Sequence, residues 1–263
     1  IFDGNGATIK GLKIGSSKES PYETTGRVGL FGYLDGGTVK DLSVEVAIYT
    51  NGDTSSSSHM VGAIAGECKL ATVDGCTVTG SIICSASGSK GLRVGGVVGT
   101  AIKGTVISNC VNRVTVEANG NGIDTMAGGV VAYMYDDGAE PYVVNCCNLG
   151  NVTANAAGKT AYVGGIVGAT YCFNTANTNY LLNCYNAGSV SATEGTTMRV
   201  GSIAGQAVYC TLDYLYWLNG TADSAFGIIN NTTLQGSGVS TEAMTQENLQ
   251  GLADTLNTNV AAL

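Results

Sequence analysis

The chain contains a single histidine, His59, so any catalysis by an imidazole side chain would have to use it. A Ser–His–Asp or Cys–His active site needs this ring beside a nucleophile, and the HExxH zinc motif needs two histidines. His59 follows a run of four serines, 55–58, which is typical of a solvated loop. We therefore expect His59 to be exposed to solvent, and we expect no histidine-dependent active site.

Nine cysteines are present, and four of them recur at a regular spacing. These are Cys76, Cys110, Cys146 and Cys184, which are separated by 34, 36 and 38 residues. In a chain of stacked units this spacing places them in one column, within reach of disulfide formation. Free cysteine is also among the most buried residue types, and sulfurs in a line do not surround a metal ion tetrahedrally. We favour buried thiols over disulfides, and we predict neither a metal site nor a cofactor.

Tyrosines also recur in step with the sequence. Tyr135 and Tyr171 lie at the same distance after a recurring glycine-rich segment, and Tyr209 lies one residue farther from its own copy. A row of exposed rings is suited to binding a sugar. Alternatively, stacked tyrosines cover apolar surface at a corner and keep their hydroxyl groups in water. We take Tyr135, Tyr171 and Tyr209 as the candidate ligand-binding residues.

The densest acidic cluster contains Asp136, Asp137 and Glu140. Glycoside hydrolysis uses two carboxyl groups that flank the scissile bond, so this cluster is the first place to look for such a pair. Neighbouring carboxylates beside Gly138 are more typical of an exposed turn. We therefore predict no catalytic residue.

The glycine-rich segment itself occurs six times, which makes the chain a repeat protein. The copies begin at Val28, Val61, Val94, Ala127, Val163 and Val200, at spacings of 33, 33, 33, 36 and 37 residues. A dinucleotide-binding glycine motif occurs once, between a strand and a helix, and no helix is predicted after any copy here. We expect these glycines to mark places where neighbouring backbones, or the opposite wall, approach too closely for a Cβ atom.

A second segment follows in each period and ends in alternating β-branched residues, as in Val152-Thr153 and Val190-Ser191. This alternation predicts strands. A unit of two or three short strands cannot bury its own apolar face, so successive units must stack. The sequence predicts an all-β fold, a right-handed parallel β-solenoid (β-helix-like) of about six coils. At about 4.8 Å per coil, the stack would be about 30 Å long.

The repeat region covers residues 1–217, and we assign residues 218–263 to a C-terminal capping segment. The two ends of a stack expose open sheet edges unless something covers them. Thr241 is a suitable helix N-cap, and four residues at helical spacing follow it: Leu249, Leu252, Ala253 and Leu256. We expect a short helix that caps the last coil.

Charge and hydropathy exclude two classes of partner. Twelve basic and twenty acidic residues give a net charge of −8 without any run of Lys or Arg, so nucleic acid and anionic membranes are poor partners. No apolar run approaches the roughly 20 residues of a transmembrane helix. We expect no membrane span in this segment, and we expect a signal or anchor to lie outside it.

The repeat resembles the GLUG-motif family of bacterial extracellular proteins. Residues 29–32 read Gly-Leu-Phe-Gly, residues 96–99 and 165–168 vary this core conservatively, and residues 183–190 resemble the segment that accompanies it. Residues 127–132 depart from the pattern by ending in Ala132 instead of glycine. The resemblance covers residues 1 to about 217, and it implies a secreted or surface location and no catalytic residue.

These observations favour a non-catalytic repeat module at a bacterial cell surface or in the extracellular space. We expect an adhesin-like or stalk role, with an unidentified glycan or surface protein as partner. A carbohydrate-active lyase or hydrolase is the alternative, and it would require acidic and basic side chains clustered on one wall. Of the basic residues, Arg93, Arg113 and Arg199 are expected nearest to the repeat faces. An accessory domain of a larger surface protease is a further alternative.

Overall fold

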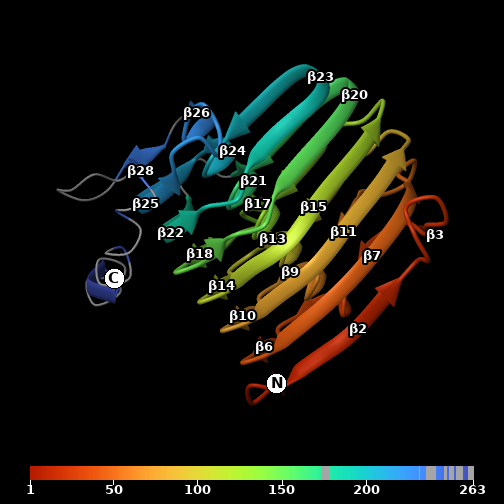
Figure 1. Ribbon diagram of the computed structural model, residues 1–263, viewed down its shortest axis with the longest axis horizontal. Coiled ribbons are helices and arrows are strands. Elements are labelled where there is room, and N and C mark those ends of the chain that lie inside the picture. The colour runs from red at the N-terminus through yellow and green to blue at the C-terminus, as the bar shows by residue number, and fades with distance from the viewer. Residues whose placement is uncertain are drawn as a thin grey trace.

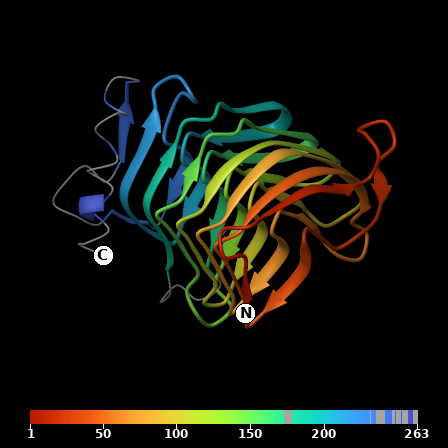
Figure 2. The same cartoon turned by 60° about the horizontal axis from the view of Figure 1, so that its bottom comes forward.

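The computed structural model describes residues 1–172, 178–230, 232–234, 241–245, 248, 252 and 257–259. Within these residues the chain is almost entirely parallel β-strand and forms a β-solenoid of about six coils (Figure 1). Strands of successive coils lie side by side from one end of the molecule to the other (Figure 2). The fold class predicted from the repeat is confirmed.

Each complete coil has four strand positions, which we call the short wall, the long wall, the third wall and the fourth wall. The short wall contains β1 (Phe2–Asp3), β6 (Thr38–Lys40), β10 (Thr72–Asp74), β14 (Val106–Ser108), β18 (Tyr142–Val144) and the first parts of β22 (Asn179–Asn186) and β25 (Cys210–Leu218). The long wall contains β2 (Thr8–Ile14), β3 (Tyr22–Glu23), β7 (Ser43–Asp53), β11 (Thr77–Ser87), β15 (Val111–Asn121), β19 (Cys147–Asn148), β20 (Val152–Gly164) and β23 (Val190–Gly201).

The other two walls flank the glycine-rich turn. The third wall contains β4 (Arg27–Val28), β8 (His59–Val61), β12 (Leu92–Gly95), β16 (Thr125–Gly128) and the last residues of β20 and β23. The fourth wall is a separate sheet of β5 (Phe31–Asp35), β9 (Ala65–Lys69), β13 (Val98–Ile102), β17 (Val131–Tyr135), β21 (Val167–Tyr171), β24 (Ala204–Val208) and β26 (Phe226–Asn230).

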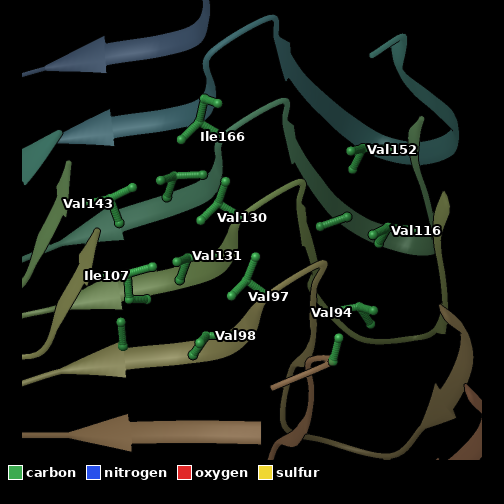
Figure 3. Packing of buried hydrophobic residues seen from close by; sticks show 14 of the residues in the cluster. Val94, Val97, Val98, Ile107, Val116, Val130, Val131, Val143, Val152 and Ile166 are labelled. Atoms are coloured by element: carbon green, nitrogen blue, oxygen red, sulfur yellow. The ribbon is translucent and has the colours of Figure 1, made fainter. Parts of the chain in front are cut away.

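Register is unbroken along the middle of the long wall. All eleven residues of β11 pair in parallel with β7 on one side and with β15 on the other. Because side chains alternate between the two faces of a strand, this register places like positions of successive coils in columns. Inward columns form the core, as Val98 beside Val131 and Ile107 beside Val143 illustrate (Figure 3).

The glycine-rich turn is shaped by an asparagine column on the opposite wall. Asn112, Asn148 and Asn186 are fully buried and hydrogen-bonded in a chain, with each Nδ2 donating to the Oδ1 of the next at 2.7 Å. A Cβ atom on Gly129 would lie 2.3 Å from Asn148 Cγ and 2.1 Å from the Gly165 carbonyl oxygen. The expectation that these glycines mark close approaches of other backbones and of the opposite wall is confirmed.

A second asparagine column lies at the turn between the short and long walls. Asn109, Asn145 and Asn183 have φ values of 55°, 56° and 51°, in the left-handed region that asparagine tolerates better than most residues. Asn145 Nδ2 donates to Asn109 Oδ1, and Asn183 Nδ2 donates to Asn145 Oδ1. Asn259 continues the column by donating to Asn183 Oδ1 at 3.2 Å. These side-chain amides therefore fix the turn in each of the three coils that have an asparagine at this position.

The C-terminal segment differs from the sequence-based expectation at Thr241. Thr241 is not a helix N-cap, because it begins β28 (Thr241–Met244), which pairs in parallel with residues 215–218 of β25. Strand pairing also continues past Trp217 through β26 and β27 (Thr233–Leu234). Main-chain hydrogen bonding to the last coil thus outweighs the local helical pattern there.

Among the described residues, Leu252 and residues 257–259 are helical, and Leu252 is buried. Leu249, Ala253 and Leu256, which the predicted cap also used, lie outside the described residues. No helix in the described part of the chain is long and apolar enough to cross a membrane.

Candidate ligand-binding site

Three of the four arginines lie in one outward-facing column of the third wall. Leu92 and Val94 are fully buried, so Arg93 between them points outward from β12. Strand register places Arg93 between Met60 and Met126. The whole column contains Arg27, Met60, Arg93, Met126, Tyr162 and Arg199.

The facing column lies on the fourth wall and contains Tyr33, Glu67, Thr100, Tyr133, Ala169 and Gln206. The tight glycine turn between the two walls brings the columns together. Arg27 Cζ lies 4.5 Å from the centroid of the Tyr33 ring, and Arg93 Cζ lies 4.5 Å from that of Tyr133. Arg199 Nη1 donates a hydrogen bond to Gln206 Oε1. We call the part formed by Arg27, Tyr33, Glu67, Arg93, Thr100, Tyr133 and Tyr135 the arginine–tyrosine corner.

The two cations of this corner are in different environments. Arg27 Nε donates to Glu67 Oε2 at 2.9 Å, and this hydrogen bond raises the pKa of Arg27. Arg93 has no hydrogen-bond or ion-pair partner among the described residues, its Nε is buried, and burial lowers its pKa. The corner therefore holds one carboxylate against two guanidinium groups.

Among the neutral residues of the corner, Thr100 and Tyr133 lie side by side in the fourth-wall column. Thr100 is fully buried, and its Oγ1 has no hydrogen-bond partner in the described structure. Tyr133 is next to Thr100 in the column, and its ring lies against Arg93. The centroids of the Tyr133 and Tyr135 rings are 5.3 Å apart. Burial raises the pKa of Tyr133 to about 12, so its hydroxyl group is a hydrogen-bond donor at neutral pH.

Of the three tyrosines taken from the sequence, two are brought together. Tyr135 and Tyr171 are register partners in β17 and β21, and the Tyr171 side chain is 40% exposed. Tyr209 lies in the turn after β24 with a φ of 51°, and its backbone N–H donates to the Asn230 carbonyl. It is therefore outside the Tyr135–Tyr171 row, because its coil has one more residue before the turn.

Sequence reasoning missed Tyr133 and a second tyrosine pair on the short wall. Tyr142 and Tyr180 are stacked with ring centroids 4.4 Å apart and ring planes 3° apart. Their spacing of 38 residues equals that between Cys146 and Cys184, which is a signal that they share a column. Each ring covers one face of the other.

A polar hollow on the long wall is a second surface of interest. It has a volume of about 330 Å³ and is lined by outward residues of four coils, including Asn51, Ser85, Asn119 and Asn155. Three of the amides already donate to carboxylates: Asn51 to Glu23, Asn119 to Glu117 and Asn155 to Glu194. The lining of the hollow is thus neutral and amide-rich, with carboxylates hydrogen-bonded to its amides and Glu117 also paired with Lys18, whereas the arginine–tyrosine corner is cationic.

His59 is not in a solvated loop, and that expectation was wrong. Its side chain is fully buried, and its Nε2 lies 2.9 Å from Thr50 Oγ1. Burial lowers the pKa of His59 to about 4. The ring fits because residue 52 is glycine, where a Cβ atom would lie 2.8 Å from His59 Cγ. No nucleophile–base pair results, since the partner is a threonine inside the core.

The cysteine column is present, and all nine cysteines, which lie within the described residues, are free. Each thiol of the column donates to backbone carbonyls: Cys110 to Ser108 at 3.1 Å and to Val73 in the preceding coil at 3.6 Å. Leu42 and Leu215 occupy the same column at its two ends. The thiols thus replace leucine as buried apolar groups.

The acidic cluster is only partly exposed, contrary to expectation. Asp136 is buried, whereas Asp137 is exposed. Asp136 directly follows the end of β17 and Asp137 lies in the bend after it, so the two carboxyl groups occupy different environments. In the described part of the chain, no group of three or more His, Cys, Asp or Glu residues is arranged to hold a metal ion.

No known protein-family model matches the chain, and no curated protein matches it.

Proposed function

We propose that the chain is a non-catalytic repeat module of a secreted or surface-displayed bacterial protein, of the GLUG-motif type, and that it binds a glycan at the arginine–tyrosine corner. The observation that carries the proposal is that arginines of the third wall lie against tyrosines of the fourth wall along the row of glycine turns, Arg27 against Tyr33 in one coil and Arg93 against Tyr133 of the following coil. Guanidinium and phenol groups together supply the donors that recognise sugar oxygens. The neighbouring pair of Tyr135 and Tyr171 extends this row along the fourth wall.

A glycan array with the intact chain tests the proposal. We expect binding that is lost when Tyr135 and Tyr171 are both changed to Ala. The matched control is the double change of Tyr142 and Tyr180 to Ala, which removes a tyrosine pair from the short wall and should leave binding unchanged. Absence of binding to every glycan would contradict the proposal and favour a structural spacer.

An enzyme is the second candidate, because Arg27, Glu67 and Arg93 bring acidic and basic groups to one corner. Two features argue for binding instead. Glu67 is already paired with Arg27, and the raised pKa of Tyr133 leaves no phenolate base at neutral pH. Release of new reducing ends or of unsaturated sugars from a bound glycan would overturn the non-catalytic part of the proposal.

A further inference from the structure

We infer that the ligand of the arginine–tyrosine corner is an acidic sugar, and that Arg93 binds its carboxylate. This inference rests on the proposed function, since it names the chemical class of the ligand that the corner would take. It also makes Arg93 a ligand-binding residue, a role that the sequence did not assign to it.

The first argument is the charge of the corner. Two guanidinium groups face one carboxylate, and Glu67 is already paired with Arg27 at 2.9 Å. Arg93 is left without a counter-ion within ion-pair distance among the described residues, in a chain whose net charge is −8. A partly buried cation without a partner is costly, and a single anionic group of a ligand would neutralise it.

The second argument is the unmet hydrogen-bonding capacity of Arg93 and of Thr100, which belongs to the facing column. Arg93 Nε and Thr100 Oγ1 are both buried without a partner, and they lie on adjoining strands, β12 and β13, of one coil. Buried polar groups in folded proteins are nearly always hydrogen-bonded. Arg93 lies against the face of the Tyr133 ring, an arrangement that orients its planar fork. A guanidinium held in this way is suited to a carboxylate, which accepts two parallel hydrogen bonds.

The third argument concerns neutral sugars, which commonly bind by lying on a ring face. Arginine side chains lie against the rings of Tyr33 and Tyr133, so each of these rings has one face covered. What Arg93 offers a ligand is the set of charged N–H donors on its guanidinium group. This favours a monoanionic sugar over a neutral one.

The test is isothermal titration calorimetry of the whole chain with a panel of oligosaccharides. Acidic members are tetragalacturonate, a hyaluronan tetrasaccharide, an alginate tetramer and sialyllactose. The methyl ester of tetragalacturonate is the neutral counterpart of the first, and a sulfated chondroitin tetrasaccharide carries an additional sulfate group. We expect binding of at least one carboxylated sugar, no binding of its ester or neutral counterpart, and weaker binding as salt is raised.

Arg93→Met is the informative variant, because Met60 and Met126 are its neighbours in the same column and show that this side chain fits there. Loss of a charge-assisted pair predicts binding weaker by about tenfold to a hundredfold. Arg113→Met is the matched control. It removes an exposed arginine from the long wall and should leave affinity unchanged. Thermal unfolding of both variants verifies that they remain folded.

Equal binding of the acid and its neutral counterpart, or full affinity in Arg93→Met, would overturn the inference. If a neutral sugar binds and the Tyr135 and Tyr171 double variant abolishes that binding, the proposed function stands and the acidic ligand is wrong. Binding that requires the sulfate group would overturn the inference as stated, because the anion recognised would be a sulfate ester and not a carboxylate. Failure of every acidic sugar to bind would also reject the inference.

Discussion

Asparagine has two separate structural roles in this chain, and the difference lies in backbone conformation. Asn112, Asn148 and Asn186 face the core and stack their amides against glycines of the opposite wall. Asn109 and Asn145 instead adopt positive φ at an exposed corner. The motif Asn-Cys-x-Asn therefore places one amide in a turn and the other inside the coil, with a buried thiol between them.

Removing one core amide should be costly. Asn148 accepts a hydrogen bond from the Gly150 N–H, donates to the Gly150 carbonyl, and links Asn112 to Asn186. Asn148→Ala leaves these buried groups unpaired, so we expect a loss of about 3 kcal/mol in the free energy of unfolding in urea. The control Asn155→Ala removes an outward amide and should change it by less than about 0.5 kcal/mol. Similar losses in the two variants would show that the amide column is not stabilising.

Because His59 is buried in its neutral form, the free energy of unfolding should fall as the pH becomes acidic. Its pKa is about 4 in the folded chain and about 6.5 when unfolded, so the unfolded state binds the proton more tightly. The stabilising contribution of the neutral ring is complete above pH 6.5 and is lost as the pH falls towards 4. Between pH 7 and pH 4.5, we expect the wild type to lose about 2 kcal/mol more than His59→Gln, measured by urea unfolding at both values. Equal losses would place His59 in solvent.

At the scale of elements, the repeat spacing was enough to predict parallel strands, stacked coils and the cysteine column. It could not predict that Thr241 begins a strand, because a four-residue segment shows no period and its pairing depends on residues 215–218. The burial of His59 was predictable from alignment of the copies. His59 precedes Val61 by two residues, as the buried Leu92 precedes Val94, but the neighbouring serines concealed the start of the strand.

The candidate site was harder to predict than the fold. The shared offset of Tyr135 and Tyr171 was visible in the sequence, and they are register partners. Nothing in the sequence showed that Arg93 would lie against Tyr133, since these residues are 40 positions apart and meet only through the glycine turn and the stacking of coils. Contacts between walls depend on side-chain direction as well as on spacing.

The burial of the cysteines, both inside and outside the column, leads to a prediction about thiol chemistry. The thiolate is the reactive form, and burial raises the pKa of Cys84 and Cys210 to about 12 and that of Cys147 to about 11. We expect Ellman's reagent to react slowly with the native chain, at Cys147 first, because that residue is the one not fully buried. All nine thiols should react after unfolding in guanidinium without reductant. Recovery of seven or fewer would indicate disulfides in the column.

For the whole molecule, the four walls divide the surface by chemistry. The long wall carries the amide-lined hollow with Glu23 and Glu117, and the corner between the third and fourth walls carries Arg27 and Arg93. An acidic ligand would be attracted by the second surface, where Arg93 has no carboxylate partner within ion-pair distance among the described residues. The parallel pairing of successive coils sets where each surface lies along the solenoid.

The most direct test of the proposed site uses the scarcity of arginine. The chain has four arginines, so a proton–nitrogen correlation spectrum contains four Nε–Hε signals, which single substitutions to Lys would assign. During titration with an acidic oligosaccharide such as tetragalacturonate, the account predicts the largest shift at Arg93, smaller shifts at Arg27 and Arg199, and none at Arg113. A shift at Arg113 with Arg93 unchanged would place the ligand on the long wall and contradict it.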